Sequence, residues 1–429
     1  MTFTLQNVAL PNGERTNIVI TENSISSIGK NVAGEIVDCT DLLVLPGLVD
    51  LHTHLREPGK EDSETVLSGS QSAVIGGFTA VSAMANTSPV ADTAGVVEQV
   101  FRLGKEAGLC AVYPVGAVTV GLAGERLAEL GAMADSAAHV RVFSDDGKCV
   151  SDPLVMRRAL EYVKSFGGVI AQHAQDPRLT EHAQMNEGEV SSRLGLSGWP
   201  AVAEEAIIAR DILLADHVKS RLHICHLTTK GGVELVRWAK SQGINVSAEV
   251  TPHHLLLTDD LVESYDPVYK VNPPLRTSQD VMALRAGLAD GTIDIVATDH
   301  APHPAEEKEC EWSAASFGML GLETALSVVA KTMVNEGLMN WEDVARVMSI
   351  NPARIGGYAR QGQEIALGAP ANLTVIHPTQ QWSVNKEKLA SKSRNTPFHG
   401  QTLPVKVAHT IYEGVIVVKD GELTGNKYE

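Results

Sequence analysis

Imidazole and carboxylate side chains recur in this sequence at the ends of short apolar segments. The set is His52, His54, Asp146, His173, His226 and Asp299. Residues two apart in an extended segment share one face, so His52 and His54 project to the same side. Histidine nitrogens combined with carboxylate oxygens suit Zn²⁺, with Mn²⁺ or Co²⁺ as plausible substitutes. Four imidazoles and two carboxylates exceed the needs of one tetrahedral ion, and they fit two ions ~3.5–4 Å apart that share a bridging ligand.

Other histidines near these positions have plainer interpretations. His223 lies three residues before His226, so the two cannot share one strand face, and His226 is the nearer to the strand end. His253 and His254 follow another apolar segment, and either could form hydrogen bonds that orient a metal ligand. The remaining histidines are expected to be ordinary core or surface residues: His139, His182, His217, His377, His399 and His409.

The elements that must position these residues are short β-branched segments that alternate with helical stretches. The strand segments span 43–54, 77–87, 110–119, 140–147, 167–176, 221–229, 244–254 and 293–303. Apolar periodicity predicts helices at 152–166, behind an Asp-Pro start, and at 200–218 and 320–334. Eight such alternations predict an α/β protein with a (β/α)₈ TIM-like barrel, whose functional residues follow the strands. The alternative, an open doubly wound sheet, lacks a G-x-G-x-x-G turn after an early strand.

Both ends of the chain have a different pattern, with short strand-like pieces and turn signals such as Pro11-Asn12-Gly13. We expect residues 1–45 and 361–429 to form one small β-sandwich domain beside a catalytic barrel of residues 46–360. The polar stretch 385–400, rich in Ser and Lys, is expected to be a surface excursion.

The composition disfavours several kinds of partner. The 429 residues carry 35 Lys and Arg against 52 Asp and Glu, a net charge of −17, which argues against nucleic acid or an anionic membrane. The five cysteines are scattered and form no C-x-x-C pair, which favours a reducing compartment over a disulfide framework. No signal peptide is visible, and no apolar run approaches the ~20 residues of a membrane span. We therefore expect a soluble, cytoplasmic protein.

Eight motifs in order resemble the dihydroorotase family of the amidohydrolase superfamily. They are PGLVDLHTHLREPG (46–59), ANTSP (85–89), FSDDG (143–147), ICHLTTKGG (224–232), AEVTPHHLLL (248–257), YKVNPPLR (269–276), TDHAPH (298–303) and FGMLGLETA (317–325). The tail at residues 362–373 is also similar, so the resemblance covers essentially the whole chain. The chain resembles most the longer bacterial form of the family, in which an Asp stands where many relatives carry a carboxylated Lys bridge.

The resemblance implies reversible hydrolysis of dihydroorotate to N-carbamoyl-L-aspartate, a step of pyrimidine (UMP) biosynthesis, at a centre of two zinc ions. The implied ligands are His52, His54 and Asp299 for one zinc and His173 and His226 for the second, with Asp146 and a hydroxide between them. Asp146 is preferred to Asp145 because it adjoins Gly147, although this Asp-Asp-Gly run is also compatible with a simple turn.

The implied substrate contacts are His54, Arg56, Asn86, Asn272, His303, Phe317 and Gly318. Arg56 offers a planar fork for a carboxylate, which a neutral ring would not need. Two cations would lower the pKa of a bridging water, and Asp299 would act as general base and then as general acid for the departing ring nitrogen.

The sequence departs from the family pattern in two places. Ser316 stands where a Pro is expected. Lys148 comes after Gly147, out of register with a bridging lysine, and its carboxylation is kept as an alternative. The acidic segment 304–316 is compatible with an ordinary insertion or with a lid over the substrate.

Two other kinds of function agree less well with these residues. Hydantoinases and dihydropyrimidinases share the fold and metal chemistry but typically use a Lys bridge and neutral rings, so Arg56 and Asp146 argue against them. Allantoinase is disfavoured by the KVNPPLR and ANTSP segments. A non-catalytic scaffold for a transcarbamoylase would be expected to lack metal ligands, which are all present here.

Family members are often dimers or join an aspartate transcarbamoylase, so we expect a homodimer or such a complex.

Overall fold

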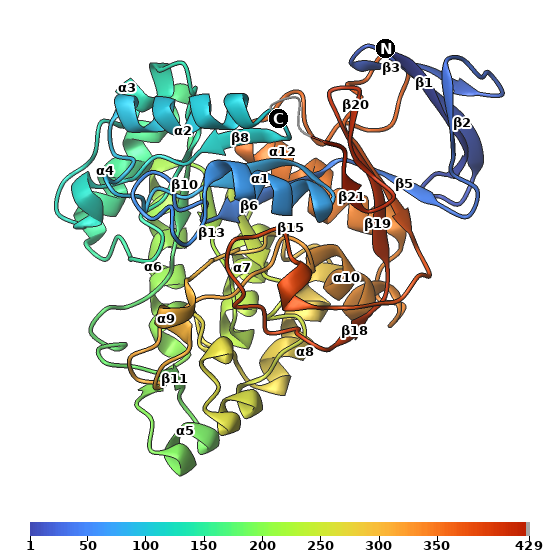
Figure 1. Ribbon diagram of the computed structural model, residues 1–429. Helices are drawn as coiled ribbons and strands as arrows, with labels where there is room; N and C mark the ends of the chain where they lie inside the picture. Colours follow the sequence, from blue (N-terminus) through green and yellow to red (C-terminus); the bar gives the residue numbers. More distant parts are fainter. Residues whose placement is uncertain (426–429) are drawn as a thin grey trace.

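The computed structural model describes residues 1–425, which form a parallel barrel and a sheet built from both ends of the chain (Figure 1). The barrel strands are β6 (Leu48–Thr53), β7 (Phe78–Ala83), β8 (Ala111–Pro114), β9 (Val142–Phe143), β10 (Val169–Gln172), β13 (Leu222–Ile224), β14 (Val246–Val250) and β15 (Ile295–Val296). Their ladders are all parallel. Isolated bridges between Gly116 and Phe143 and between Thr53 and His300 close the ring. The predicted α/β barrel is confirmed.

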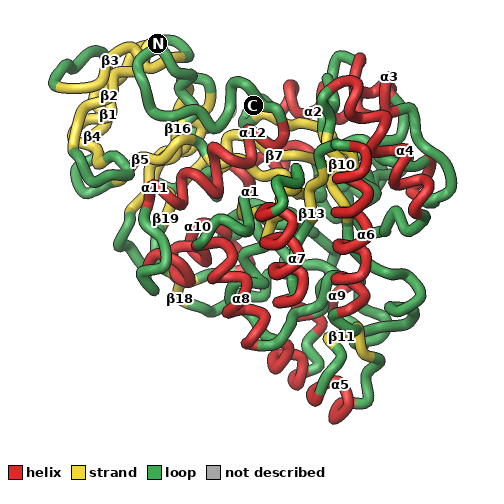
Figure 2. The backbone as a smooth tube through the Cα atoms, turned by 180° about the vertical axis from the view of Figure 1, so that it is seen from behind, coloured by secondary structure: helices red, strands yellow, loops and turns green. Residues whose placement is uncertain are grey.

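Helices cover the outside of the barrel (Figure 2). The longer ones are α1 (Val66–Ile75), α2 (Ala94–Ala107), α4 (Pro153–Val163), α6 (Val202–Val218), α7 (Lys230–Ser241) and α8 (Ser278–Ala289). Shorter ones are α3 (Leu130–Asp135), α5 (Glu189–Leu194), α9 (Ala305–Lys308), α10 (Ala325–Val329), α11 (Trp341–Ala345) and α12 (Asn351–Gly356). The Asp-Pro signal is confirmed at α4, where the Asp152 carboxylate accepts hydrogen bonds from the N–H groups of Leu154 and Val155.

Short 3₁₀ and π segments complete the helical structure. The 3₁₀ turns are η1 (Val120–Leu122), η2 (Lys164–Phe166), η3 (Asp259–Ser264), η4 (Pro267–Tyr269) and η7 (Lys386–Lys388), and the π turns are η5 (Ala330–Val334) and η6 (Arg346–Ile350). The helix predicted at 152–166 is therefore α4 followed by η2, and the one predicted at 320–334 is confined to α10 and η5.

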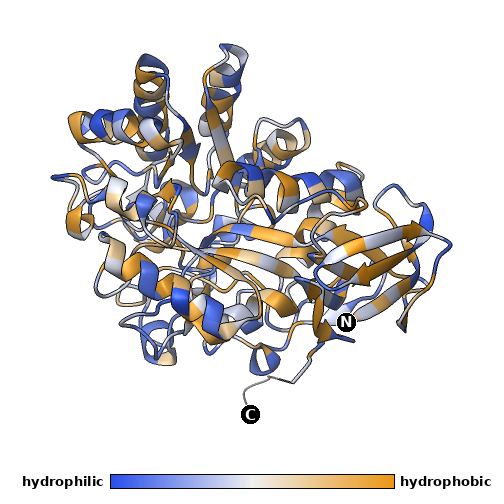
Figure 3. Ribbon diagram, turned by 90° about the horizontal axis from the view of Figure 1, so that it is seen from above, coloured by the Kyte–Doolittle hydropathy of each residue, from blue (hydrophilic) through white to orange (hydrophobic). Residues whose placement is uncertain are grey.

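The barrel strands are buried on both faces. Every residue of β6, β7 and β10 is buried, as expected where helices cover one face and packed side chains fill the interior. Apolar residues concentrate in the central strands, while the surrounding helices mix apolar and polar residues (Figure 3). Among the described residues, no helix is long and apolar enough to cross a membrane.

Nine strands from the two ends of the chain form a second sheet, in the order β21-β20-β19-β16-β5-β1-β2-β3, with β4 beside β1. Their bounds are β1 (Thr2–Ala9), β2 (Arg15–Thr21), β3 (Ser24–Gly29), β4 (Glu35–Asp38), β5 (Leu43–Pro46), β16 (Leu373–His377), β19 (Lys406–Tyr412), β20 (Val415–Lys419) and β21 (Glu422–Leu423). Two small ladders pair β11 (Met185–Asn186) with β12 (Gly198–Trp199) and β17 (Trp382–Ser383) with β18 (Thr402–Leu403). The domain divisions at 45/46 and 360/361 stay predictions.

Two expectations about these ends need correction. The single strand expected at 43–54 is two strands in different sheets, because β5 pairs with β16 while β6 pairs with β7. Gly47 joins them at a close approach, where a Cβ would lie 2.3 Å from Oγ1 of Thr79. The stretch 385–400 is not simply a surface excursion, because Ser391 and Asn395 are buried at 1% and 5% exposure.

Candidate metal centre

The six predicted ligands lie together in the barrel interior, and all are buried. Asp146 is central among them. Its Oδ1 lies 3.2 Å from Nε2 of His52 and 3.1 Å from Nε2 of His226. The same oxygen lies 3.2 Å from Nδ1 of His173, and Oδ2 lies 3.3 Å from Nε2 of His54. Because its carboxylate contacts all four imidazoles, Asp146 has the position of a bridging ligand.

Asp299 contacts the same Nε2 atoms of His52 and His54 that contact Asp146. Its Oδ1 is 3.1 Å from Nε2 of His54 and 3.6 Å from Nε2 of His52. Ligand atoms of His52, His54 and Asp299 all lie within 4.8 Å of one another, as do those of His52, Asp146 and His226. The residues thus offer two adjoining clusters, each able to hold a cation.

The outward nitrogens of three imidazoles have oxygen partners. Nδ1 of His52 lies 2.6 Å from Oε1 of Glu249, and Nδ1 of His54 lies 2.9 Å from Oδ1 of Asn86. Nε2 of His173 lies 2.7 Å from Oε1 of Gln175. Since these oxygens accept hydrogen bonds, each outward nitrogen donates, and the lone pair is left on the inward nitrogen.

The donor set fits metal cations. Among the described residues, Nε2 of His52 has no hydrogen-bond partner although it is buried. A buried polar atom without a partner is costly. An imidazole nitrogen that carries a lone pair and faces carboxylate oxygens is satisfied by a divalent cation, so these residues fit the expected pair of ions.

Glu249 was missed by the sequence reasoning. Its Oε2 lies 2.9 Å from Nε2 of His223, whose Nδ1 lies 2.8 Å from Oγ of Ser247. Its Oε1 accepts a hydrogen bond from the backbone N–H of His226 as well as from His52. An ionisable residue inside the buried strand β14 was the signal that could have revealed it.

Positive charge inside the cluster, from protonated imidazoles or from bound cations in their place, keeps the central carboxyl groups ionised. Burial by itself would raise the pKa of Asp299, but His52 and His54 hold it at about 2. Burial opposes ionisation of Asp146 in the same way, yet His52, His173 and His226 keep its pKa well below the ordinary value. Both carboxylates can therefore act as metal ligands near neutral pH.

The backbone is strained at three residues of the predicted metal and substrate site. Arg56, His226 and Asp299 adopt φ values of +63°, +30° and +47°, in the left-handed region that non-glycine residues rarely occupy. Such strain persists where surrounding structure fixes it, and it is common at functional sites.

The predicted substrate residues lie beside the cluster. Nε of the buried Arg56 donates to the carbonyl oxygen of Pro302 at 3.1 Å, and its Nη2 lies 3.4 Å from Nε2 of His303. That same imidazole nitrogen lies 2.8 Å from the carbonyl oxygen of Phe317, which precedes Gly318. Nδ2 of Asn272 donates at 3.3 Å to Oε1 of Gln175, the oxygen that also accepts from His173.

The two alternatives to Asp146 as a bridge lie elsewhere. Asp145 accepts hydrogen bonds from the backbone N–H groups of Val118 and Thr119 at 2.8 and 2.9 Å, so it fixes the loop after β8. Lys148 is exposed and takes no part in the clusters described above. The geometry supports Asp146, and its assignment as a ligand stays a prediction.

Comparison with known proteins identifies the family. Residues 41–232 match a model described as Dihydro-orotase-like. The chain is 64% identical to a dihydroorotase from Streptomyces coelicolor over 415 residues, which is 96% of this chain and 97% of that protein. It is 54% identical to a dihydroorotase from Mycobacterium tuberculosis over 415 residues, 96% of each chain. The chain belongs to the dihydroorotase family.

Solved structures agree on the fold. An L-hydantoinase (dihydropyrimidinase) from Arthrobacter aurescens superposes with a TM-score of 0.87 at 25% identity, covering 99% of this chain and 97% of that one. A D-hydantoinase from Thermus sp. gives a TM-score of 0.80 at 22% identity, covering 99% and 97%. As a dihydroorotase family member, the chain is a metal-dependent cyclic amidohydrolase of pyrimidine biosynthesis. The predicted family and enzyme class are confirmed.

Proposed function

We propose that this chain hydrolyses the ring amide of dihydroorotate, reversibly, to N-carbamoyl-L-aspartate at a centre of two Zn²⁺ ions. The observation that carries the proposal is the position of Asp146 among four imidazoles beside a buried arginine. Arg56 supplies the cation that a substrate carboxylate requires, which a neutral hydantoin ring would not use.

Six residues would hold the ions. His52, His54 and Asp299 would hold one ion, His173 and His226 would hold the other, and Asp146 would be shared between them. Imidazole nitrogens and carboxylate oxygens favour zinc, although Mn²⁺ or Co²⁺ can occupy such ligands. When bound, the ions supply Lewis acidity and a water of lowered pKa.

The protein's own residues carry the proton and orient the ring. Asp299, ionised among the histidines, accepts a proton from the attacking water as the water oxygen bonds to the ring amide carbon. The carbon–nitrogen bond then breaks, and Asp299 returns the proton to the departing nitrogen. Arg56 and His303 bind the substrate carboxylate, with Phe317 and Gly318 beside them. Asn86 and Asn272 orient the ring, and Asn86 also fixes His54.

The wider organisation follows the family. The barrel of residues 46–360 would carry the reaction, and residues 1–45 and 361–429 would form the accessory β domain, of which residues 426–429 lie outside the described residues. A cytoplasmic homodimer, or a complex with an aspartate transcarbamoylase, is the expected assembly.

The decisive experiment is hydrolysis of dihydroorotate by the isolated, zinc-loaded chain, with carbamoyl-aspartate measured as the product. We expect turnover that a chelator abolishes and added zinc restores. A chain that holds two zinc ions but hydrolyses hydantoin or allantoin in preference to dihydroorotate would contradict the proposal.

A further inference from the structure

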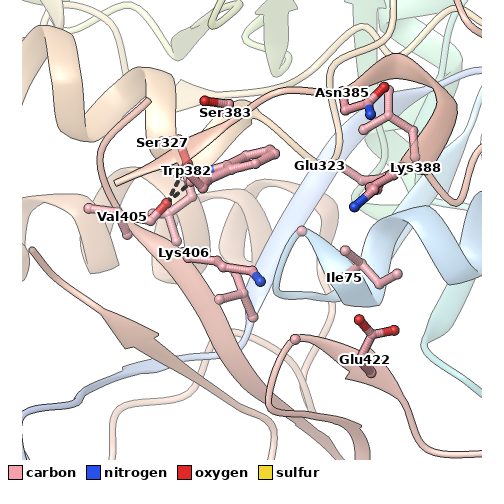
Figure 4. A pocket seen from close by; sticks show the side chains of 15 residues that line it. Ile75, Glu323, Ser327, Trp382, Ser383, Asn385, Lys388, Val405, Lys406 and Glu422 are labelled. Atoms are coloured by element: carbon pink, nitrogen blue, oxygen red, sulfur yellow. Dashed lines mark hydrogen bonds between the residues drawn. The ribbon is translucent and has the colours of Figure 1, made fainter. Parts of the chain in front are cut away.

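The segment of residues 390–396 lies far along the chain from the barrel motifs, yet it packs against the barrel mouth. Just before it, Asn385 and Lys388 border a cleft of about 330 Å³ between the barrel and the nine-stranded sheet, together with Trp382 and Lys406 (Figure 4). This cleft contains none of the predicted metal ligands. From there the chain passes inward to Asn395, which is 5% exposed.

Backbone hydrogen bonds fix this segment to the barrel. Oε1 of Glu323 accepts from the N–H groups of Ala390 and Ser391 at 3.0 and 3.3 Å. Oε1 of Glu64 accepts from the N–H group of Lys392 at 3.1 Å. Because the buried Glu64 and the half-buried Glu323 come from separate parts of the barrel, the segment has a defined position on it.

Asn395 then connects two loops with its side chain. Its Nδ2 donates to the carbonyl oxygens of Ala301 and Gly318 at 2.9 and 3.2 Å. Its Oδ1 accepts from the backbone N–H of His303 at 3.2 Å. Its backbone oxygen accepts from Leu320 at 3.1 Å, in the same loop as Gly318.

The chemistry of the amide explains why asparagine suits this position. The carbonyl oxygens of Ala301 and Gly318 accept hydrogen bonds, and the backbone N–H of His303 donates one. The carboxamide of Asn395 provides both the donor and the acceptor that these groups require. Aspartate would place an oxygen against the two buried carbonyl groups, and alanine would remove the hydrogen bonds to all three groups.

We propose that Asn395 is a positioning residue for substrate binding, which holds His303 and Gly318 in the geometry that receives the substrate carboxylate. The inference rests on the proposed function, since His303 and Gly318 are substrate contacts only if that function is right. It assigns part of substrate recognition to the C-terminal part of the chain. Because Asn395 contacts none of the predicted metal ligands, its loss should act on binding and leave the metal centre intact.

The test compares Asn395→Ala and Asn395→Asp with the full-length wild type, all loaded with zinc. We expect KM for dihydroorotate to rise about tenfold or more, equivalent to about 1.4 kcal/mol of binding, while kcat changes by less than about threefold and zinc content is unchanged. Asn385→Ala is the matched control, because among the described residues the side chain of Asn385 accepts only from the backbone N–H of Glu387, two residues further along the chain and outside the 390–396 segment. It should leave KM, kcat and zinc content as in the wild type.

A double variant separates positioning from general stability. If Asn395 acts through His303, the effect of Asn395→Ala on KM should shrink in a His303→Ala background. Unchanged KM in the Asn395 variants, or effects that add fully to those of His303→Ala, would overturn the proposal. If Asn395→Ala does not fold, the same measurements of KM, kcat and zinc content on Asn395→Asp test the proposal, because aspartate keeps the side-chain volume. An inactive wild type would instead contradict the proposed function.

Discussion

Nδ1 of His52 lies 2.6 Å from Oε1 of Glu249, and both side chains are fully buried. An ionised carboxylate can only accept hydrogen bonds, so Nδ1 of His52 is the donor in this contact. In the neutral imidazole, the form that binds a metal, the lone pair then lies on Nε2, which faces Asp146. The other carboxylate oxygen of Glu249 is bound by His223. This arrangement fixes both the orientation and the tautomer of a predicted metal ligand, from a residue outside the ligand set.

Replacing Glu249 should therefore weaken metal binding. Glu249→Gln can still occupy the space, but it loses the negative charge that stabilises the donating imidazole. We expect zinc affinity to fall by about 10- to 100-fold, as measured by competition with a chromogenic chelator. Glu234→Gln on the exposed face of α7 is the control and should bind zinc as the wild type does. Equal affinities in the two variants would show that Glu249 does not support the centre.

The neighbouring aspartates of the FSDDG motif should behave differently. Asp146→Asn removes a carboxylate that contacts four imidazoles, so zinc content and turnover should both collapse. Asp145→Asn should retain zinc and mainly lower stability by about 1–3 kcal/mol, because Asp145 binds the backbone of Val118 and Thr119. Elemental analysis and denaturant unfolding measure the two effects. The reverse pattern would mean that Asp145 is the ligand.

Asp299 should be essential for turnover but dispensable for the fold. Asp299→Ala removes both a metal ligand and the group proposed to shuttle the proton, so kcat should fall by at least about 10³-fold. Steady-state rates and circular dichroism at matched zinc saturation test this expectation. Appreciable turnover in a folded Asp299→Ala variant would require a different general base.

Arg56 should govern substrate affinity. Arg56→Met keeps much of the apolar stem but removes the charge, so KM for dihydroorotate should rise roughly 10- to 100-fold, the effect of losing a hydrogen bond to a charged group. Zinc content should not change, because Arg56 faces His303 and Pro302 and is not one of the ligands. If KM is unaffected, the carboxylate-binding role is wrong.

The buried Lys308 should make stability depend on pH. Burial, with a contribution from Lys270, lowers the pKa of Lys308 to about 7, below its ordinary value near 10.5. Between these values the unfolded chain binds more protons than the folded one, so the free energy of unfolding should rise as pH rises. From pH 7 to pH 9 the wild type should gain on the order of 2 kcal/mol relative to Lys308→Met.

Denaturant unfolding at the two pH values measures this gain. Lys308 donates to the carbonyl oxygens of Lys270, Ser316 and Gly318 at 3.2, 2.8 and 3.0 Å, so it also ties the 304–316 segment to the barrel. Lys331→Met, on η5, is a control that should follow the wild type. A Lys308→Met variant with the same pH dependence as the wild type would contradict the expected proton release.

Much of the site could be predicted from the sequence because its ligands follow apolar strands. In a parallel barrel all strand ends of one kind meet at one mouth, so His52, His173 and Asp299 could be placed together without knowledge of their distances. The contact between Glu249 and His223 could not be predicted in this way. Their contact depends on the lateral register of β13 and β14, which sets His223 opposite Ser247, and no local pattern encodes that register.

The sequence by itself thus determined the alternation of strands and helices, the family motifs and the set of predicted metal ligands, since these depend on local periodicity and residue type. Only the tertiary structure decided that residues 43–54 divide between two sheets and that Asn395 lies against Ala301 and Gly318. These contacts join segments far apart in the chain. Their partners are selected by packing and by the need to satisfy buried polar groups, which the intervening sequence does not specify.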